Sequence, residues 1–262
     1  MCLIFLSWRR HAAFPLVVAA NRDEFYGRPT APAAFWDDAA GLLAGRDLTG
    51  GGTWLGVTRA GRFAALTNHR SGGATAADAD APTRGRLVSD FLLSEVAPGA
   101  YVESLSRRAG AYNGFNLLIG DGEGLHWISN RGGNPRELAP GTYGVSNALL
   151  DTPWPKLIRG KKRFETLLER RDPDPDEIFD LLSDRRMADE DSLPDTGIGF
   201  ERERALSPIF ITAGDYGTRS STVLLVRSDG YTEFHERTHE HGTSESKTLT
   251  YAYPVEPDRE AV

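Results

Sequence analysis

Short apolar runs between turn-forming residues fill both ends of the chain, and helical spacing fills its middle. Such runs are typical of buried strands, whereas apolar residues three and four positions apart are typical of amphipathic helices. The pattern predicts strands over residues 2–6, 16–20, 53–57, 62–68, 115–119, 125–128, 143–147, 208–212, 220–227, 231–237 and 247–253. It predicts helices over residues 85–96, 101–109, 154–170 and 176–182.

Strands in hairpins, then helices, then strands again are the order of an α+β fold with antiparallel sheets. The small polar residues 71–82 predict an exposed loop, and the proline-rich residues 185–199 predict an ordered loop or a mobile lid. The last few residues are expected to fray. No internal repeat or linker divides the sequence, so we predict one domain over residues 1–262.

The bulk composition narrows the class of protein. Hydrophobic residues make up 40% of the 262 positions, which indicates a globular chain. A formal net charge of −7 argues against a nucleic-acid-binding surface. The first apolar run ends at Arg9, too early for a signal peptide, and no run of about 20 apolar residues predicts a membrane span. A single cysteine excludes an intramolecular disulfide, so we expect a cytoplasmic protein.

That single cysteine, Cys2, directly follows the initiator Met1. Removal of Met1 would leave a thiol and a free α-amine on one residue, and the amine, with a pKa near ~8, could accept the thiol proton. The alternative is that Cys2 is a small buried apolar residue that begins a strand, because free cysteine is among the most buried residue types.

Strongly polar residues follow several of the predicted strands. Arg22 and Asp23 come directly after the second strand, and a hairpin would bring them near Cys2. An exposed turn would explain the same two residues. Asn68 and Asn147 also end apolar strands, where an amide N–H could stabilise an oxyanion, although asparagine is an ordinary turn former as well.

Arg219 stands among hydroxyl residues at the start of a later strand, where it could bind a carboxylate or a thiolate.

The spacing of His235, Glu236 and His239 matches the zinc-binding motif of metalloproteases, with His241 as a further ligand. That motif requires a helix, whereas residues 231–234 alternate as in a strand. Side chains four positions apart in a strand lie roughly 13 Å apart, too far for two bonds of about 2.1 Å to one zinc ion. The sequence therefore predicts no metal site.

Seven motifs in order over most of the chain resemble the NRDE family, also called the transport and Golgi organisation 2 family. They are residues 1–4 (MCLI), 20–25 (ANRDEF), 52–56 (GTWLG), 66–68 (LTN), 112–117 (YNGFNL), 144–147 (GVSN) and 217–222 (GTRSST). The resemblance implies the N-terminal-nucleophile hydrolase fold, a four-layer αββα sandwich of two antiparallel sheets between helices. A looser similarity of pattern links the chain to penicillin V acylases and choloylglycine hydrolases.

The resemblance also implies roles for the site residues. Cys2 would be the nucleophile with its own amine as base, Arg22 would stabilise the thiolate, and Asp23 would orient the amine. The other residues would be oxyanion or substrate contacts, Asn68 and Asn147, and an arginine that completes the site, Arg219. Neither Asn21 nor Glu24 receives a comparably clear role.

Two functions follow from these expectations, and a third interpretation keeps the fold with a site that has lost its activity. The first is an N-terminal-cysteine amidohydrolase that acts on a small amide or acyl substrate and requires no cofactor. The second, implied by the family's association with haem and lipid handling, is a non-catalytic protein that binds or carries haem or an acyl lipid. Cys2 or one of the six histidines could ligate haem iron, although no haem-attachment motif is present.

Overall fold

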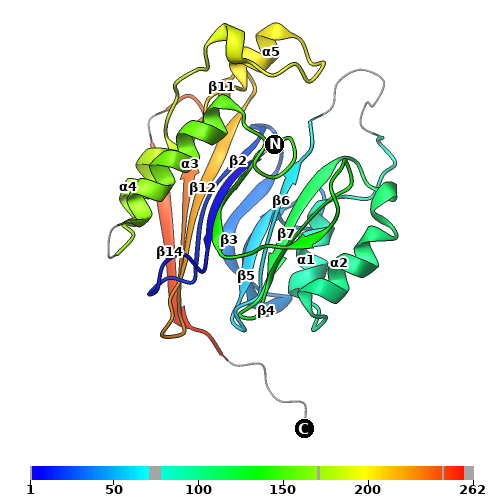
Figure 1. Ribbon diagram of the computed structural model, residues 1–262, viewed down its shortest axis with the longest axis vertical. Coiled ribbons are helices and arrows are strands. Elements are labelled where there is room, and N and C mark those ends of the chain that lie inside the picture. The colour runs from blue at the N-terminus through cyan, green and yellow to red at the C-terminus, as the bar shows by residue number, and fades with distance from the viewer. Residues whose placement is uncertain (1, 71–77, 170–171, 244, 257–262) are drawn as a thin grey trace.

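The computed structural model describes residues 2–70, 78–169, 172–243 and 245–256, and these residues form two antiparallel sheets covered by helices on their outer faces (Figure 1). The first sheet has the order β10 (Gly141–Val145), β1 (Cys2–Trp8), β2 (Leu16–Phe25), β12 (Tyr216–Val226), β13 (Tyr231–His239) and β14 (Ser246–Pro254), with β11 (Thr212–Ala213) beside β12. The second sheet has the order β3 (Thr30–Trp36), β4 (Ala39–Asp47), β5 (Leu55–Thr58), β6 (Phe63–Asn68), β7 (Phe115–Gly120), β8 (Leu125–Ser129) and β9 (Arg136–Glu137).

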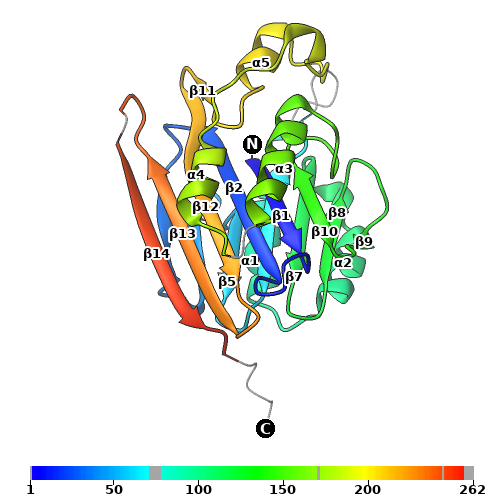
Figure 2. The same ribbon diagram turned by 60° about the vertical axis from the view of Figure 1, so that its left-hand side comes forward.

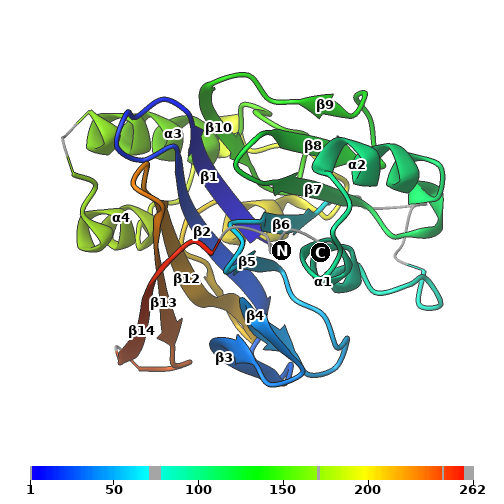
Figure 3. The same ribbon diagram turned by 90° about the horizontal axis from the view of Figure 1, so that it is seen from below.

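Each sheet has its own pair of helices. Figure 2 shows α3 (Pro155–Leu168) and α4 (Pro175–Leu182) lying over the first sheet. Figure 3 shows α1 (Gly85–Leu92) and α2 (Pro98–Ser106) on the opposite side of the molecule. A short helix, α5 (Phe200–Ala205), and two 3₁₀ turns, η2 (Ala109–Ala111) and η3 (Glu190–Ser192), complete the helical elements of the described residues.

Three apolar clusters hold these four layers together. Leu6, Val18 and Phe63 belong to the cluster between the sheets. Phe91 belongs to the cluster beneath α1 and α2, and Phe5 to the one beneath α3 and α4. All of β1 is buried because alternate residues enter two different clusters, which explains its continuous apolar run. The predicted four-layer αββα fold is confirmed.

Two strands of the second sheet, β3 and β4, lie where no element was predicted. Their sequences are rich in alanine and include Pro32 and two glycines, residues with low strand propensity. Pro32 is tolerated because β3 is an edge strand whose register breaks between Ala31 and Ala34.

The strand predicted over residues 208–212 is wrong, since only Thr212 belongs to a strand, β11. The segment is apolar because Ile209 packs beneath α3 and α4 and Ile211 is buried as well. Most hydrogen bonds of its backbone are made outside the ladders of the two sheets. Phe210 N–H donates to the Asp184 carbonyl (2.9 Å), and Ile211 N–H donates to Thr218 Oγ1 (2.9 Å). The apolar run therefore indicates burial here but does not indicate a strand.

Some predicted boundaries also change. Helix α1 ends at Leu92 rather than at residue 96, and residues 185–199 contain only the short turn η3. Most of the predicted loop over 71–82 and the predicted frayed end fall outside the described residues. Within the described part of the chain, every helix is too short or too polar to cross a membrane.

Candidate active site

The polar residues predicted to follow the second strand instead continue it. Strand β2 extends to Phe25 between β1 and β12, so Asn21, Arg22, Asp23 and Glu24 belong to a central strand. Successive side chains alternate between the faces of a sheet. Arg22 and Glu24 therefore point between the two sheets, whereas Asn21 and Asp23 point toward the helical layer.

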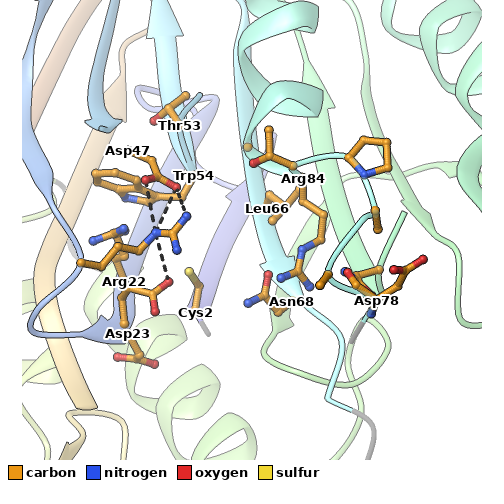
Figure 4. A pocket seen from close by; sticks show the side chains of 18 residues that line it. Cys2, Arg22, Asp23, Asp47, Thr53, Trp54, Leu66, Asn68, Asp78 and Arg84 are labelled. Atoms are coloured by element: carbon orange, nitrogen blue, oxygen red, sulfur yellow. Dashed lines mark hydrogen bonds and ion pairs between the residues drawn. The ribbon is translucent and has the colours of Figure 1, made fainter. Parts of the chain in front are cut away.

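Cys2 is directly opposite Arg22 in the β1–β2 ladder, so both side chains lie on the face between the sheets. Cys2 is 9% exposed, and it lines a cavity of about 350 Å³ at the ends of the two sheets. Figure 4 shows Arg22 and Asp23 on one side of the Cys2 thiol, with Asn68 and Arg84 on the other. The hairpin predicted to bring Arg22 and Asp23 to the cysteine is thus observed.

Arg22 is held flat against the second sheet. Its guanidinium carbon lies 4.1 Å from the centre of the Trp54 ring, and its Nη1 donates to Thr30 Oγ1 (3.1 Å). Burial lowers the pKa of Arg22, while the nearby Cys2 and Glu24 raise it. A desolvated cation beside the sulfur favours the thiolate.

Asp23 occupies the other face of β2, where it is 1% exposed. Its Oδ1 accepts a hydrogen bond from Thr218 Oγ1 (2.7 Å), and its backbone carbonyl accepts one from the Tyr216 hydroxyl (2.8 Å). Burial raises the pKa of the Asp23 carboxyl, and the positive charge of Lys156 opposes that rise. Lys156 is itself buried, and burial lowers its pKa to about 8.

The Cys2 thiol, with Met1 still in the chain, is under opposed influences. Burial raises its pKa, and the Asp23 carboxylate adds to that rise. Arg22 and a hydrogen bond from the Asp23 backbone N–H act in the opposite direction. The thiol is therefore not strongly activated before Met1 is removed.

The two predicted asparagines have different positions. Asn68, at the end of β6, lines the cavity. Asn147 is fully buried and does not line it; its Nδ2 donates to the Asn68 backbone carbonyl (2.9 Å), and its own carbonyl accepts from Arg70 N–H (2.6 Å). Asn147 therefore supports the backbone that carries Asn68.

Arg219 also lies outside the cavity around Cys2. Its Nη1 donates to the carbonyls of Phe25 (2.8 Å) and Arg28 (3.0 Å), so it fixes the turn after β2. Together with Arg22 it lines a second cavity of about 280 Å³ on the far side of the Arg22–Trp54 stack. The position of Arg219 at a bulge in β12 directs its side chain to this turn.

The structure also gives positions to the two residues of the polar cluster that the sequence left without roles. Asn21 Nδ2 donates to the carbonyls of Leu182 (2.9 Å) and Ile209 (3.0 Å), which ties α4 and the segment after α5 to the first sheet. Its Oδ1 accepts a hydrogen bond from Ser221 (2.6 Å). Glu24 lines the cavity and lies 4.0 Å from Arg28.

Four charged cavity residues were not predicted from the sequence: Arg28, Asp47, Asp78 and Arg84. Arg28 forms an ion pair with Asp47 (2.7 Å). Arg84 precedes α1, whose start is pressed against the second sheet because Gly52 and Gly85 meet backbone to backbone. A side chain on Gly52 would run into Gly85. The sequence signal for this close approach is the run of three consecutive glycines at residues 50–52.

The histidine motif lies in strand β13, as predicted. His235 Nδ1 is 3.1 Å from Thr250 Oγ1, and His239 Nε2 is 2.9 Å from Ser221 Oγ, so the two rings have separate partners. In the described residues, no group of three or more histidine, cysteine or acidic side chains is arranged to hold a metal ion.

Comparison with known proteins identifies the family of the chain. A family model described as "Transport and Golgi organisation 2" matches residues 1–241. The chain belongs to the transport and Golgi organisation 2 family. It is 40% identical to a bovine transport and Golgi organization protein 2 homolog over 90% of this chain and 92% of the relative. The mouse homolog is 37% identical over 98% of this chain and 100% of the relative.

A solved structure shows a similar fold outside this family. The C2A mutant of a conjugated bile acid hydrolase from Clostridium perfringens aligns with a TM-score of 0.50 at 10% identity, with 100% of both chains covered. At 10% identity, this similarity bears on the fold of the chain and not on its activity.

Proposed function

We propose that this protein is an N-terminal-cysteine amidohydrolase that cleaves a small amide or acyl substrate after Met1 is removed. The observation that carries the proposal is the placement of Cys2 beside Arg22, with Asp23 on the next residue of the same strand, at the wall of a cavity. The bile acid hydrolase of similar fold was solved as a mutant with its second residue, a cysteine, replaced by alanine.

Removal of Met1 converts the backbone nitrogen of Cys2 into an α-amine with a pKa near ~8. The amine takes the thiol proton, and Arg22 stabilises the resulting thiolate. Asp23, fixed by Thr218, orients the protonated amine through its carboxylate.

The sulfur then attacks the amide carbon, and the carbonyl electron pair moves to oxygen. Asn68, on the opposite wall, stabilises this oxyanion. The carbon–nitrogen bond breaks as the leaving nitrogen takes the proton from the α-ammonium group, which leaves a thioester on Cys2. Water attacks the thioester carbon and gives a proton to the amine. The carbon–sulfur bond then breaks, which releases the carboxylic acid and restores the thiolate beside the ammonium group.

The direct test uses an ester that acylates any competent thiolate. With p-nitrophenyl acetate we expect a burst of nitrophenolate equal to the enzyme concentration and an acetyl adduct in the intact mass. Both should disappear in Cys2→Ala, while Asn134→Ala, an exposed control in the loop between β8 and β9 and outside the cavity, should keep both. Amide or ester cleavage that survives Cys2→Ala at the wild-type rate would refute the proposal.

One observation favours the second candidate, a non-catalytic protein that binds haem or an acyl lipid. Burial raises the pKa of the Cys2 thiol while Met1 is present, and a chain that keeps Met1 would hold an inert cysteine in a cavity. Among the described residues that line this cavity there is no histidine to share iron with Cys2. A haem titration that gives no Soret shift, or the same shift in Cys2→Ala, contradicts ligation by Cys2.

A further inference from the structure

The charged side chains around Cys2 are unevenly paired. Three arginines are among the described residues that line the cavity: Arg22, Arg28 and Arg84. Arg28 donates to both carboxylate oxygens of Asp47 and lies 4.0 Å from Glu24, so its charge is neutralised. Arg22 is stacked on Trp54 beside the sulfur.

Arg84 differs from the other two. Its guanidinium donates one hydrogen bond, from Nη1 to the carbonyl of Gly114 (2.9 Å), and forms no ion pair with a carboxylate of the described residues. Residues 71–77, which come before Arg84 in the sequence, contain no aspartate or glutamate. Burial lowers the pKa of Arg84, which means that this cation has given up part of its hydration.

The other acidic side chains that line the cavity have hydrogen-bond partners of their own or point away from Arg84. Asp47 also accepts the N–H groups of Thr49 (3.0 Å) and Gly50 (3.1 Å). Asp78 is exposed at the rim and accepts the Asp80 N–H (2.9 Å). Asp23 belongs to the other face of β2.

We propose that the substrate carries an anionic group, a carboxylate, sulfonate or phosphate, and that Arg84 binds this group from the wall opposite Cys2. Figure 4 shows the Arg84 side chain extending into the cavity from the same wall as Asn68. A guanidinium that is partly desolvated and lacks an acidic partner gains a charge-assisted hydrogen bond when an anion enters. The inference rests on the proposed function, because it concerns the substrate of the same cavity.

A matched pair of alkylating reagents tests Arg84 without requiring turnover. Iodoacetate carries a carboxylate and iodoacetamide is neutral, and every thiol adduct forms at Cys2, the single cysteine. The measured quantity is the ratio of the two alkylation rates, normalised to the same ratio for a small free thiol. Dividing by the iodoacetamide rate removes any change in the amount of thiolate.

We expect the normalised ratio to fall at least about tenfold in Arg84→Gln, the loss of about one charge-assisted contact. Arg84→Lys should keep part of the preference because it keeps the charge. Arg86→Gln, the same change at an exposed position of α1 outside the cavity, should leave the ratio unaltered. Protection of Cys2 by acetate, methanesulfonate or phosphate then ranks the anionic groups.

A ratio that is the same in wild type and Arg84→Gln overturns the inference, as does an equal fall in Arg86→Gln. A melting curve shows whether Arg84→Gln still folds. If it does not, the inference is tested by the normalised ratio in Arg84→Lys and by the salt dependence of the ratio in the wild type. A preference for iodoacetate that does not weaken with added salt would contradict recognition by charge. Failure of the proposed function would appear separately, as slow alkylation of Cys2 by iodoacetamide in every variant.

Discussion

Lys156 carries a buried positive charge behind the cavity, and its titration can be measured as protein stability. The side chain is 2% exposed, and its Nζ donates to the Leu206 carbonyl (2.9 Å). Burial lowers its pKa from 10.5 to about 8; Arg70 lowers it further, and Asp23 and Glu203 oppose the change. The folded protein therefore loses this proton at a lower pH than the unfolded chain does.

The sign of the pH dependence follows from proton binding. Between pH about 8 and pH 10.5 the unfolded chain binds more protons at Lys156 than the folded protein, so stability rises with pH over this window. Below about pH 8 the cost of burying the charged ammonium is fully present, and above pH 10.5 it is absent. One pKa unit corresponds to about 1.4 kcal/mol, so the rise amounts to about 3 kcal/mol.

Urea unfolding of wild type and Lys156→Met from about pH 7.5 to about pH 10.5 measures this effect. Other groups titrate in both proteins, so the difference in the free energy of unfolding, wild type minus variant, isolates Lys156. That difference should rise by about 3 kcal/mol across the range. Lys162→Met, an exposed position on the same helix α3, should give a constant difference. A constant difference for Lys156→Met as well would refute the burial of a charged lysine behind Asp23.

Three further substitutions test the surroundings of the site. In the wild type, the buried guanidinium of Arg70 forms an ion pair with Glu203 (2.7 Å). Glu203→Gln leaves that guanidinium buried without a carboxylate, so the substitution should lower the free energy of unfolding in urea by about 3–5 kcal/mol. Burial lowers the pKa of His239 to about 4, so the folded protein loses stability as the pH falls from 6.5 through 4. The melting temperature of His239→Gln should therefore depend less on pH over this range than that of the wild type. An equal dependence would contradict this expectation. Asn147→Ala removes the hydrogen bond to the Asn68 carbonyl, so it should lower the free energy of unfolding in urea by about 1–3 kcal/mol and slow the nitrophenolate burst. An unchanged burst would show that Asn147 does not support the site. The exposed controls, expected to match wild type, are Glu201→Gln and Asn134→Ala.

The sequence was sufficient for most of the fold because burial and strand formation coincide along most of the apolar runs. They separate at Ile209, which is buried beneath α3 and α4, and at Ile211, which is also buried, while most backbone partners of this segment lie outside a ladder. Strands β3 and β4 were missed for the opposite reason, since alanine, glycine and Pro32 form an edge that the second sheet stabilises by pairing. Local propensity does not contain that information.

The part of the site that one hairpin determines was predictable, because register alone places Cys2 opposite Arg22. The residues that come from distant elements were not, because a position at a strand end does not say which way a side chain points. Asn147 and Arg219 therefore lie behind the cavity and beside it. Arg84 enters the cavity only because two glycine backbones meet.

The central claim is that Cys2 becomes an activated N-terminal nucleophile, and one measurement addresses it directly. The intact mass of the protein purified from cells, followed during alkylation by iodoacetamide across pH, reports both the presence of Met1 and the pKa of the single thiol. The account predicts that Met1 is absent and that alkylation stays fast well below pH ~8. Retained Met1 together with a thiol that reacts only above its ordinary pKa of about 8.5 would contradict it.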